Sequence, residues 1–289
     1  MKKSANKQQE LSVLPLDEDA VWLEDKILLM DYLEKPCALT QENTQTLDSR
    51  FPMKLASSCM LIVVDGALRL GVNLRDHEVT AGSCLVIAAG AIVERVSLDA
   101  GSRIVMVSAP ASDMDGIAML NPVMQAELRP PLMEMLMTLS RMLRTIMTDP
   151  AFQLGREEAA RDCIRLMGRV IGQGVNGQEK NIAKKSRRDE IVSRFLQCVA
   201  ANYRTHRDLG FYAGELGLSL KHMSHVIHEQ TGRHPSQWIK DYVILEAKTM
   251  LRSGNYTVQQ VSDGLNFANQ SFFGKYFKEA VGVSPKKWK

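Results

Sequence analysis

Hydrophobic positions follow a short, strand-like period in the first part of the chain. Between residues 59 and 107 they form runs rich in β-branched residues, which glycine-containing turns separate. The predicted strands are 59–64, 67–72, 77–79, 84–88, 92–96 and 103–107. The Asp65-Gly66 pair between the first two runs is a strong hairpin signal. Short strands at even spacing favour a small antiparallel β-barrel or sandwich, whereas residues 21–55 stay undecided between strand and loop.

From residue 130 the period becomes helical. Helices are predicted at 130–147 and 155–171, and they are separated at Asp149-Pro150 because proline cannot continue a helix. The two share an apolar stripe formed by Met133, Leu136, Met137, Ser140, Leu143, Met147, Ala159, Cys163, Leu166, Met167 and Val170. Such a stripe is most often core. The alternative is a dimerisation surface, since flexible methionine suits contacts that re-pack.

The last hundred residues contain a helix-turn-helix pattern. Residues 211–232 have apolar edges at helical spacing, made by Tyr212, Ala213, Leu216, Met223, Val226 and Ile227. Gly217 breaks the first helix, because glycine takes the φ > 0 conformation of a tight turn without steric strain. Ser219 follows as the expected N-cap of the second helix. A short helix, a tight turn and a helix with a polar outer face predict a helix-turn-helix motif.

A second copy of the pattern follows. A shift of 50 residues superimposes the glycine, proline and tryptophan that end each copy: Gly232, Pro235, Trp238, Gly282, Pro285 and Trp288. Before the turn the shift is 49, so the second copy carries one extra residue near Asn266-Phe267. Two ordinary helical hairpins in one core would explain a single copy equally well. The repeated skeleton favours two helix-turn-helix motifs instead.

Further helices are predicted at 189–203 and 236–251. The second helix is a stiff spacer, which holds the two recognition helices at the separation of successive major-groove segments. Residues 172–177 are glycine-rich and 180–188 are basic, so this stretch is interpreted as a flexible linker.

Charge is unevenly distributed along the chain. The net charge is +3, but residues 180–289 carry 18 Lys and Arg against 9 Asp and Glu, which leaves −6 for residues 1–179. A phosphate-binding module joined to an acidic partner domain shows this distribution, and so does an accidental bias of a solvated surface.

The cysteines indicate a reducing compartment. Cys37, Cys59, Cys84, Cys163 and Cys198 are dispersed and lack a C-x-x-C pair. The first residues have positive charge without the apolar stretch of a secretory signal, and no apolar run is long enough to span a bilayer. We therefore expect a cytoplasmic protein without a membrane partner.

Residues 188–289 resemble the DNA-binding domain of the AraC/XylS family of bacterial transcription regulators. The resemblance is carried by Tyr212-Ala213, Leu216, Ser219, the spacer residues Leu245-Glu246-Ala247-Lys248 and Leu251, and the signature at 267–285. It implies that the strand region is a cupin-like sensor domain and that the helices after it contribute to a homodimer. The expected fold class is α+β. Its expected divisions are a cupin-like antiparallel β-barrel with two following helices (1–175), a linker (176–188) and two helix-turn-helix motifs joined by a linker helix (189–289).

Outward side chains on the second helix of each motif are the candidates for DNA contact. In the first motif they are Lys221, Ser224, His225 and His228; in the second they are Asn269, Gln270, Ser271, Lys275 and Lys278. Asn or Gln can pair bidentately with adenine and Lys with guanine, whereas Lys278 is expected to meet phosphate. Because histidine titrates near neutrality, affinity should fall as pH rises above about 6.5. The aromatic residues Phe267, Phe272, Phe273, Tyr276 and Phe277 are assigned to the core.

A metal centre is not expected. A cupin metal site needs two or three imidazoles, whereas His77 is the one histidine before residue 206 and Glu94 its nearest acidic neighbour on a later strand. His77 is interpreted as a polar residue near a turn at Arg75-Asp76. No catalytic residues and no cofactor are predicted.

The sequence therefore predicts a sequence-specific DNA-binding transcription regulator, with activation favoured over repression. Its partners would be double-stranded operator DNA, RNA polymerase and a small-molecule effector. One alternative is a ligand-independent regulator that a protein partner controls. The other is a cupin-type enzyme with a DNA-binding tail.

Overall fold

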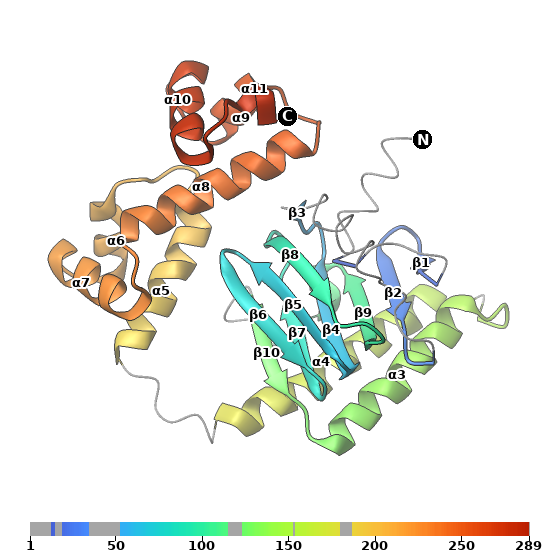
Figure 1. Cartoon of the computed structure of the whole chain (residues 1–289). Coiled ribbons are helices and arrows are strands. Elements are labelled where there is room, and N and C mark those ends of the chain that lie inside the picture. Colours follow the sequence, from blue (N-terminus) through green and yellow to red (C-terminus); the bar gives the residue numbers. More distant parts are fainter. Residues whose placement is uncertain are drawn as a thin grey trace. The chain divides into compact units, whose positions relative to one another are not determined.

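The runs between residues 59 and 107 form strands at the expected places. They are β4 (Ser58–Asp65), β5 (Ala67–Val72), β6 (Arg75–Thr80), β7 (Ser83–Ile87), β8 (Ile92–Leu98) and β9 (Arg103–Ala109). Additional strands are β1 (Val21–Leu23), β2 (Ile27–Asp31), β3 (Met53–Lys54) and β10 (Val123–Glu127). The structure is a computed structural model that describes residues 13–14, 19–34, 53–114, 123–152, 154–179 and 187–288 (Figure 1).

The chain divides into two compact units, Met1–Ile182 and Ala183–Lys289. The first unit contains the strands and two long helices, and the second unit is helical. This is an α+β chain with an antiparallel sheet domain followed by a helical domain. Residues 180–186 of the predicted linker lie outside the described part of the chain.

The strands of the first unit form two sheets. One has six strands in the order β1-β2-β9-β4-β7-β10, and the other has four in the order β3-β8-β5-β6. The strand pairs within each sheet are antiparallel. Among the described strands, no pairing joins the two sheets into a closed barrel.

Alternation along the strands divides the apolar residues between two cores. On β4, Cys59, Leu61 and Val63 join the core between the two sheets, together with residues of β5, β7 and β8. Met60 and Ile62, which alternate with them, point to the other core. This second core lies between the six-stranded sheet and the helices, so β4 is buried on both faces.

The Asp65-Gly66 turn is not a hairpin, contrary to the prediction. β4 pairs with β7 and β9, whereas β5 pairs with β6 and β8, so the turn carries the chain from one sheet to the other. Gly66 has φ +78°, and a Cβ atom there would lie 2.2 Å from Ser102 Oγ. The hairpin falls one strand later, at Asn73 and Leu74, which both have positive φ.

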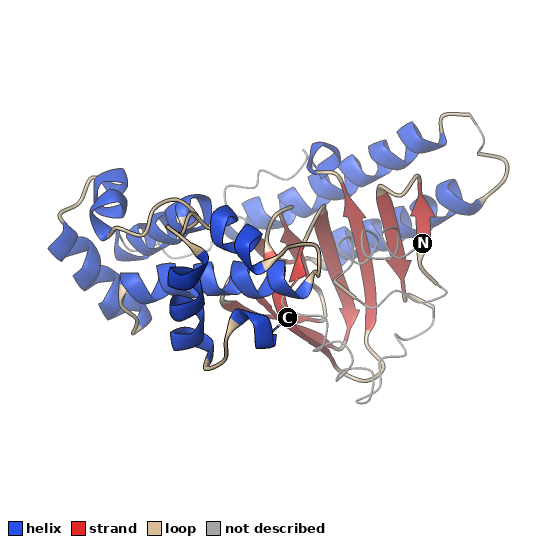
Figure 2. Cartoon of the chain, turned by 90° about the horizontal axis from the view of Figure 1, so that it is seen from above, coloured by secondary structure: helices blue, strands red, loops and turns tan. Residues whose placement is uncertain are grey.

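Helices α3 (Pro130–Thr148) and α4 (Arg156–Glu179) cover one face of the six-stranded sheet (Figure 2). Most of the predicted stripe is buried against that sheet, including Leu136, Leu143 and Met167. Leu166 is an exception, at 43% exposure. The stripe is therefore mainly core, and the exposed apolar residues of α3 are Met135 and Met142.

The glycine-rich stretch 172–177 was wrongly interpreted as a flexible linker, because α4 continues through it to Glu179. At Gly174 a Cβ atom would come within 2.8 Å of Leu128 Cδ2. This glycine allows the helix to pack closely against the segment after β10. Close packing and chain flexibility both select glycine, and the sequence alone does not separate them.

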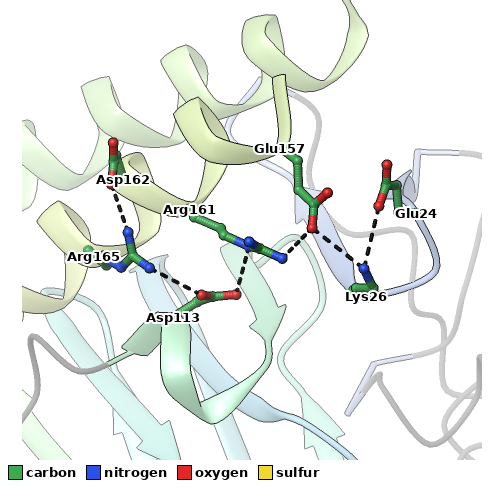
Figure 3. A network of polar contacts seen from close by, with 7 residues as sticks. All are labelled: Glu24, Lys26, Asp113, Glu157, Arg161, Asp162 and Arg165. Atoms are coloured by element: carbon green, nitrogen blue, oxygen red, sulfur yellow. Dashed lines mark hydrogen bonds and ion pairs between the residues drawn. The ribbon is translucent and has the colours of Figure 1, made fainter. Parts of the chain in front are cut away.

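A nearly buried carboxylate joins α4 to the 3-10 turn η1 (Ala111–Met114). Asp113 Oδ2 lies 3.4 Å from Arg161 Nε, and its Oδ1 lies 3.6 Å from Arg165 Nη2 (Figure 3). Arg161 also contacts Glu157, which Lys26 reaches at 3.5 Å. The network joins the turn between β1 and β2 to η1 and α4. Removal of Asp113 would leave two arginines without their buried partner, so it should destabilise this unit.

His77 and Glu94 cannot share a ligand. His77 pairs with Leu70 and Glu94 pairs with Gly71 on the intervening strand β5, so their side chains point to opposite faces of the sheet. The prediction of a turn at Arg75-Asp76 was wrong, because these residues and His77 lie within β6 and the turn is at Asn73-Leu74. Burial lowers the pKa of His77. Within the described residues, no group of three or more His, Cys, Asp or Glu is placed to hold a metal ion.

The thiols that the structure describes are free. Cys59, Cys84 and Cys163 are buried and Cys198 is half-buried, while Cys37 lies outside the described residues. Burial raises the pKa of Cys163 to about 11. In the parts of the chain with described structure, no helix has the length and apolar character needed to cross a bilayer.

The second unit is built around one long helix. Its helices are α5 (Arg187–Asn202), α6 (Leu209–Leu216), α7 (Leu220–Thr231), α8 (Pro235–Arg252), α9 (Val258–Gly264), α10 (Gln270–Val281) and α11 (Pro285–Trp288). The predicted helices at 189–203 and 236–251 correspond to α5 and α8. In α8 the residues from Tyr242 to Ala247 are all buried, which is the pattern of a helix surrounded by others. Glu246, 2% exposed, accepts a 2.9 Å hydrogen bond from Tyr203 Oη and a bond from Arg204.

Candidate nucleic-acid interface

The first motif consists of α6 and α7 and is closed by local capping. Asp208 accepts from Phe211 N at 3.0 Å, and Ser219 accepts from His222 N at 3.2 Å. Gly217 has φ +67° and its amide bonds back to α6. The predicted break and the predicted cap are therefore both confirmed. The inner positions Tyr212, Ala213, Leu216, Met223, Val226 and Ile227 are all buried.

The second motif consists of α9 and α10 and repeats this design with different residues. Thr257 and Gln260 form a capping box at the start of α9. Asn266, with φ +53°, takes the left-handed position that Gly217 takes in the first motif. The connection between Leu265 and Gln270 is one residue longer than its counterpart, as the shift from 49 to 50 predicts. Phe273 and Phe277 form the buried face of α10.

The predicted contact residues lie on the two second helices. On α7, Lys221, His225 and His228 are exposed and Ser224 is half-buried. On α10 and its cap, the exposed residues are Asn269, Gln270, Ser271, Lys275 and Lys278. Their capacity to contact bases stays a prediction, because exposure is a necessary condition only.

Asn269 is the N-cap of α10. Its Oδ1 accepts from Ser271 N and from Phe272 N, both at 3.0 Å. A bidentate contact with adenine would need the same oxygen as acceptor and would compete with the two caps. Gln270, one residue later, has no such role among the described contacts and is the better candidate for adenine.

The first motif's outer face contains an acidic residue that interacts with the basic ones. Glu229 accepts a 2.9 Å hydrogen bond from Arg188, and its carboxylate lies 3.5 Å from His225 Nε2. The His228 ring stacks on His234, with centroids 4.2 Å apart. Two of the proposed DNA-contact residues, His225 and His228, are therefore engaged in contacts within the chain. DNA would have to compete with them.

Arg207 joins the two motifs directly. It lies just before α6, and its guanidinium donates to the carbonyls of Leu265 and Asn266 in the turn of the second motif, the latter at 3.3 Å. Its Cζ atom lies 3.9 Å from the centroid of the Phe267 ring. Burial lowers the pKa of Arg207. No local pattern marks this residue, because its partners are about sixty positions away.

A helix and a side chain therefore help to fix the position of one motif relative to the other. α8 has 18 residues, which corresponds to about 27 Å of helix. Arg207 supplies a second attachment beside that helix. The spacer predicted from the sequence is thus real but does not act alone.

The assignment of all five aromatic residues to the core was wrong for Phe272. Phe273 and Phe277 are buried and Phe267 and Tyr276 are half-buried, but Phe272 is 63% exposed. Phe272 and Phe273 are neighbours in a helix and point about 100° apart, so they cannot share one narrow face.

The sequence profile of a helix-turn-helix domain family matches residues 212–289. The uncharacterized HTH-type transcriptional regulator YobQ of Bacillus subtilis (strain 168) is 40% identical over 58 residues, which are 20% of this chain and 24% of that protein. The arabinose operon regulatory protein of Salmonella typhimurium (strain LT2) is 28% identical over 85 residues, 29% of this chain and 30% of that protein. The chain thus matches less than a third of these relatives' lengths.

Solved structures are similar at low scores. ToxT from Vibrio cholerae O395 aligns with 81% of this chain and 89% of its own, with a TM-score of 0.38 and 14% identity. The DNA-binding domain of AdpA, solved with a target DNA, aligns with 34% of this chain and 87% of its own, with a TM-score of 0.32 and 20% identity. TM-scores below 0.5 establish no shared ligand or partner.

Proposed function

We propose, on the premise that its C-terminal unit is the DNA-binding domain of an AraC/XylS-family transcription regulator, that this chain binds specific operator DNA and regulates transcription from it. The carrying observation is a pair of capped helix-turn-helix motifs, each with a buried inner face and an exposed polar outer face. We favour activation, in which the bound chain contacts RNA polymerase. Such a protein would work in the cytoplasm.

The DNA-contacting surface in this proposal consists of two helix faces. It includes Lys221, Ser224, His225, His228, Asn269, Gln270, Ser271, Lys275 and Lys278. Gln270 and Lys275 are assigned to base edges because amide and ammonium groups match the acceptors and donors of the major groove. Asn269 is assigned to phosphate or sugar through its Nδ2 group, since its Oδ1 caps α10.

The decisive experiment is the selection of bound DNA from a random pool with the full chain. The expected result is a bipartite sequence whose two halves lie about one helical turn apart. The affinity for the selected site should fall steeply with salt, because the contacts with phosphate release counterions. Enrichment of no sequence, together with a flat salt dependence, would show that the proposal is wrong.

We further propose that the sheet domain is a cupin-like sensor for a small molecule and needs no cofactor. Its support is the apolar interior between the sheets, toward which Cys59, Leu61 and Leu85 all point. An apolar effector would suit that interior. To test this proposal, the DNA selection is repeated with and without small metabolites from a cell extract. An affinity for DNA that is the same in both cases would contradict a sensing role of the sheet domain.

Dimerisation is proposed through the outer surface of α3 and α4. Met135 and Met142, seven residues apart on α3, are 48% and 54% exposed, and Leu166 lies exposed on α4. Light scattering should give the mass of a dimer for the natural chain. Met142→Glu should give a monomer, whereas Glu134→Gln on the same helix should not change the mass.

Two alternatives have distinct signatures. A regulator controlled by a protein partner would bind its site equally well with every metabolite fraction. A cupin-type enzyme would copurify with stoichiometric iron, zinc or manganese, which metal analysis detects. The curated relatives are transcription regulators, and this makes the enzyme the weaker alternative.

A further inference from the structure

Phe272 is an apolar side chain that folding does not use. It lies in the first turn of α10, where its backbone amide donates to Asn269 Oδ1 at 3.0 Å. Its side chain is 63% exposed, while Phe273 and Phe277 form the helix's core face. Burial of a phenylalanine side chain stabilises a folded protein, and Phe272 forgoes most of that gain.

The helix places Phe272 beside the proposed base readers. Successive residues of an α-helix are about 100° apart, so Phe272 lies roughly 100° from Ser271 and roughly 60° from Lys275 around the axis. Ser271 and Lys275 are both exposed. The apolar Phe272 ring therefore lies next to polar side chains on the first turn of α10. In a helix-turn-helix motif, the N-terminal residues of the recognition helix are those that contact base edges.

The chemistry of the major groove offers one partner for such a ring. Base edges there present hydrogen-bond donors and acceptors, except for the C5-methyl group of thymine, and phenylalanine is among the side chains that contact this methyl. We infer that Phe272 contacts a thymine methyl in the half-site that the second motif reads. This inference rests on the proposed function and makes that function more specific.

The first motif provides the internal comparison. With the shift of 50, the counterpart of Phe272 is His222, which is also exposed. An imidazole carries polar nitrogens that the methyl group cannot satisfy. The requirement for the methyl should consequently belong to one half-site and not to its counterpart.

Replacement of thymine by deoxyuridine tests the inference, because it removes the methyl and keeps every hydrogen-bonding group. The full chain is titrated against its selected site with each thymine replaced in turn. At one thymine of the second half-site the Kd should rise about fourfold, the factor that corresponds to one buried methyl. Phe272→Ala should weaken binding to the thymine site by at least that factor, and deoxyuridine should then cause no further loss.

Two controls separate this contact from indirect effects. His222→Ala should keep the full dependence on the methyl, and circular dichroism should show that Phe272→Ala melts like the natural chain. Insensitivity of the natural chain to every replacement would overturn the inference. The same dependence in Phe272→Ala as in the natural chain would also overturn it and leave the ring for a protein partner. In both cases a selected sequence would still support the proposed function, whereas the absence of one would refute both.

Discussion

The two helix-turn-helix motifs share a scaffold and differ in the surface they present. Gly232 and Gly282 end α7 and α10 in the left-handed conformation, with φ of 69° and 86°. A proline then starts the next helix in each case. The outer faces differ in their ion pairs. His225 lies beside Glu229, whereas Lys275 has no ion pair with any described residue, and Glu279, the counterpart of Glu229, pairs with Lys240 at 3.0 Å.

This difference shows which positions a repeated fold constrains. Caps, turns and inner positions must satisfy the backbone and the core, so both copies have capping, turn-forming and apolar residues there, although their identities differ. Outer positions must only tolerate water, so they are free to diverge toward different DNA contacts. We expect the second motif to provide most of the sequence discrimination.

The largest expected effect is on specific binding. Gln270→Ala combined with Lys275→Ala should weaken the affinity for the selected site by about 2–4 kcal/mol, from about 1–3 kcal/mol per good bidentate contact. Lys221→Ala combined with His225→Ala should reduce it by about 1 kcal/mol, because His225 is held by Glu229. Gel-shift titrations at one salt concentration measure both. Equal losses of affinity for the two double variants would show that the second motif does not dominate sequence discrimination.

The contact between the motifs should have the next largest effect. Arg207→Lys keeps the charge, but one ammonium group cannot donate to both carbonyls and stack on Phe267. We expect the free energy of unfolding to fall by about 2 kcal/mol in urea denaturation followed by circular dichroism. Arg194→Lys, at an exposed position of α5, is the matched control and should change little. A stable Arg207→Lys variant would show that this contact adds little to the connection that α8 provides.

Substitutions in the turns of the two motifs should have a smaller effect on stability. Gly217→Ala places a Cβ atom in open space but at φ +67°, so its cost of about 1–2 kcal/mol is purely conformational. Asn266→Gly should change stability by less than about 0.5 kcal/mol, because glycine adopts the same conformation freely. The same denaturation experiment compares them. Equal destabilisation would mean that the Asn266 side chain, which reaches Thr205 O at 3.5 Å, contributes more than its conformation.

The smallest expected effect has the opposite sign. Gly274 lies inside α10, and a Cβ atom there would meet nothing within 4 Å. Gly274→Ala should raise the free energy of unfolding by about 0.5–1 kcal/mol through helix propensity. Ser224→Ala is the equivalent change in α7 and should give a smaller gain. Destabilisation by Gly274→Ala would contradict the open surface beside the helix.

Local signals in the sequence determined much of this protein. Glycine turns and β-branched runs located the central strands, and the repeat located both motifs, with Ser219 as the cap of the first recognition helix. The extra residue at the second turn also followed from counting alone. These features depend on backbone conformation and on burial period, which neighbouring residues specify.

Other features were decided by the tertiary structure alone. Asp65-Gly66 looks like a hairpin but connects two sheets, because strand pairing depends on residues far along the chain. Gly174 looks flexible but packs on Leu128. The roles of Phe272 and Arg207 depend on their surroundings in the folded chain. The Phe272 ring stays exposed, and the Arg207 guanidinium contacts a turn about sixty residues away. Side-chain identity encodes what a residue can do, and only the folded chain determines which neighbours it meets.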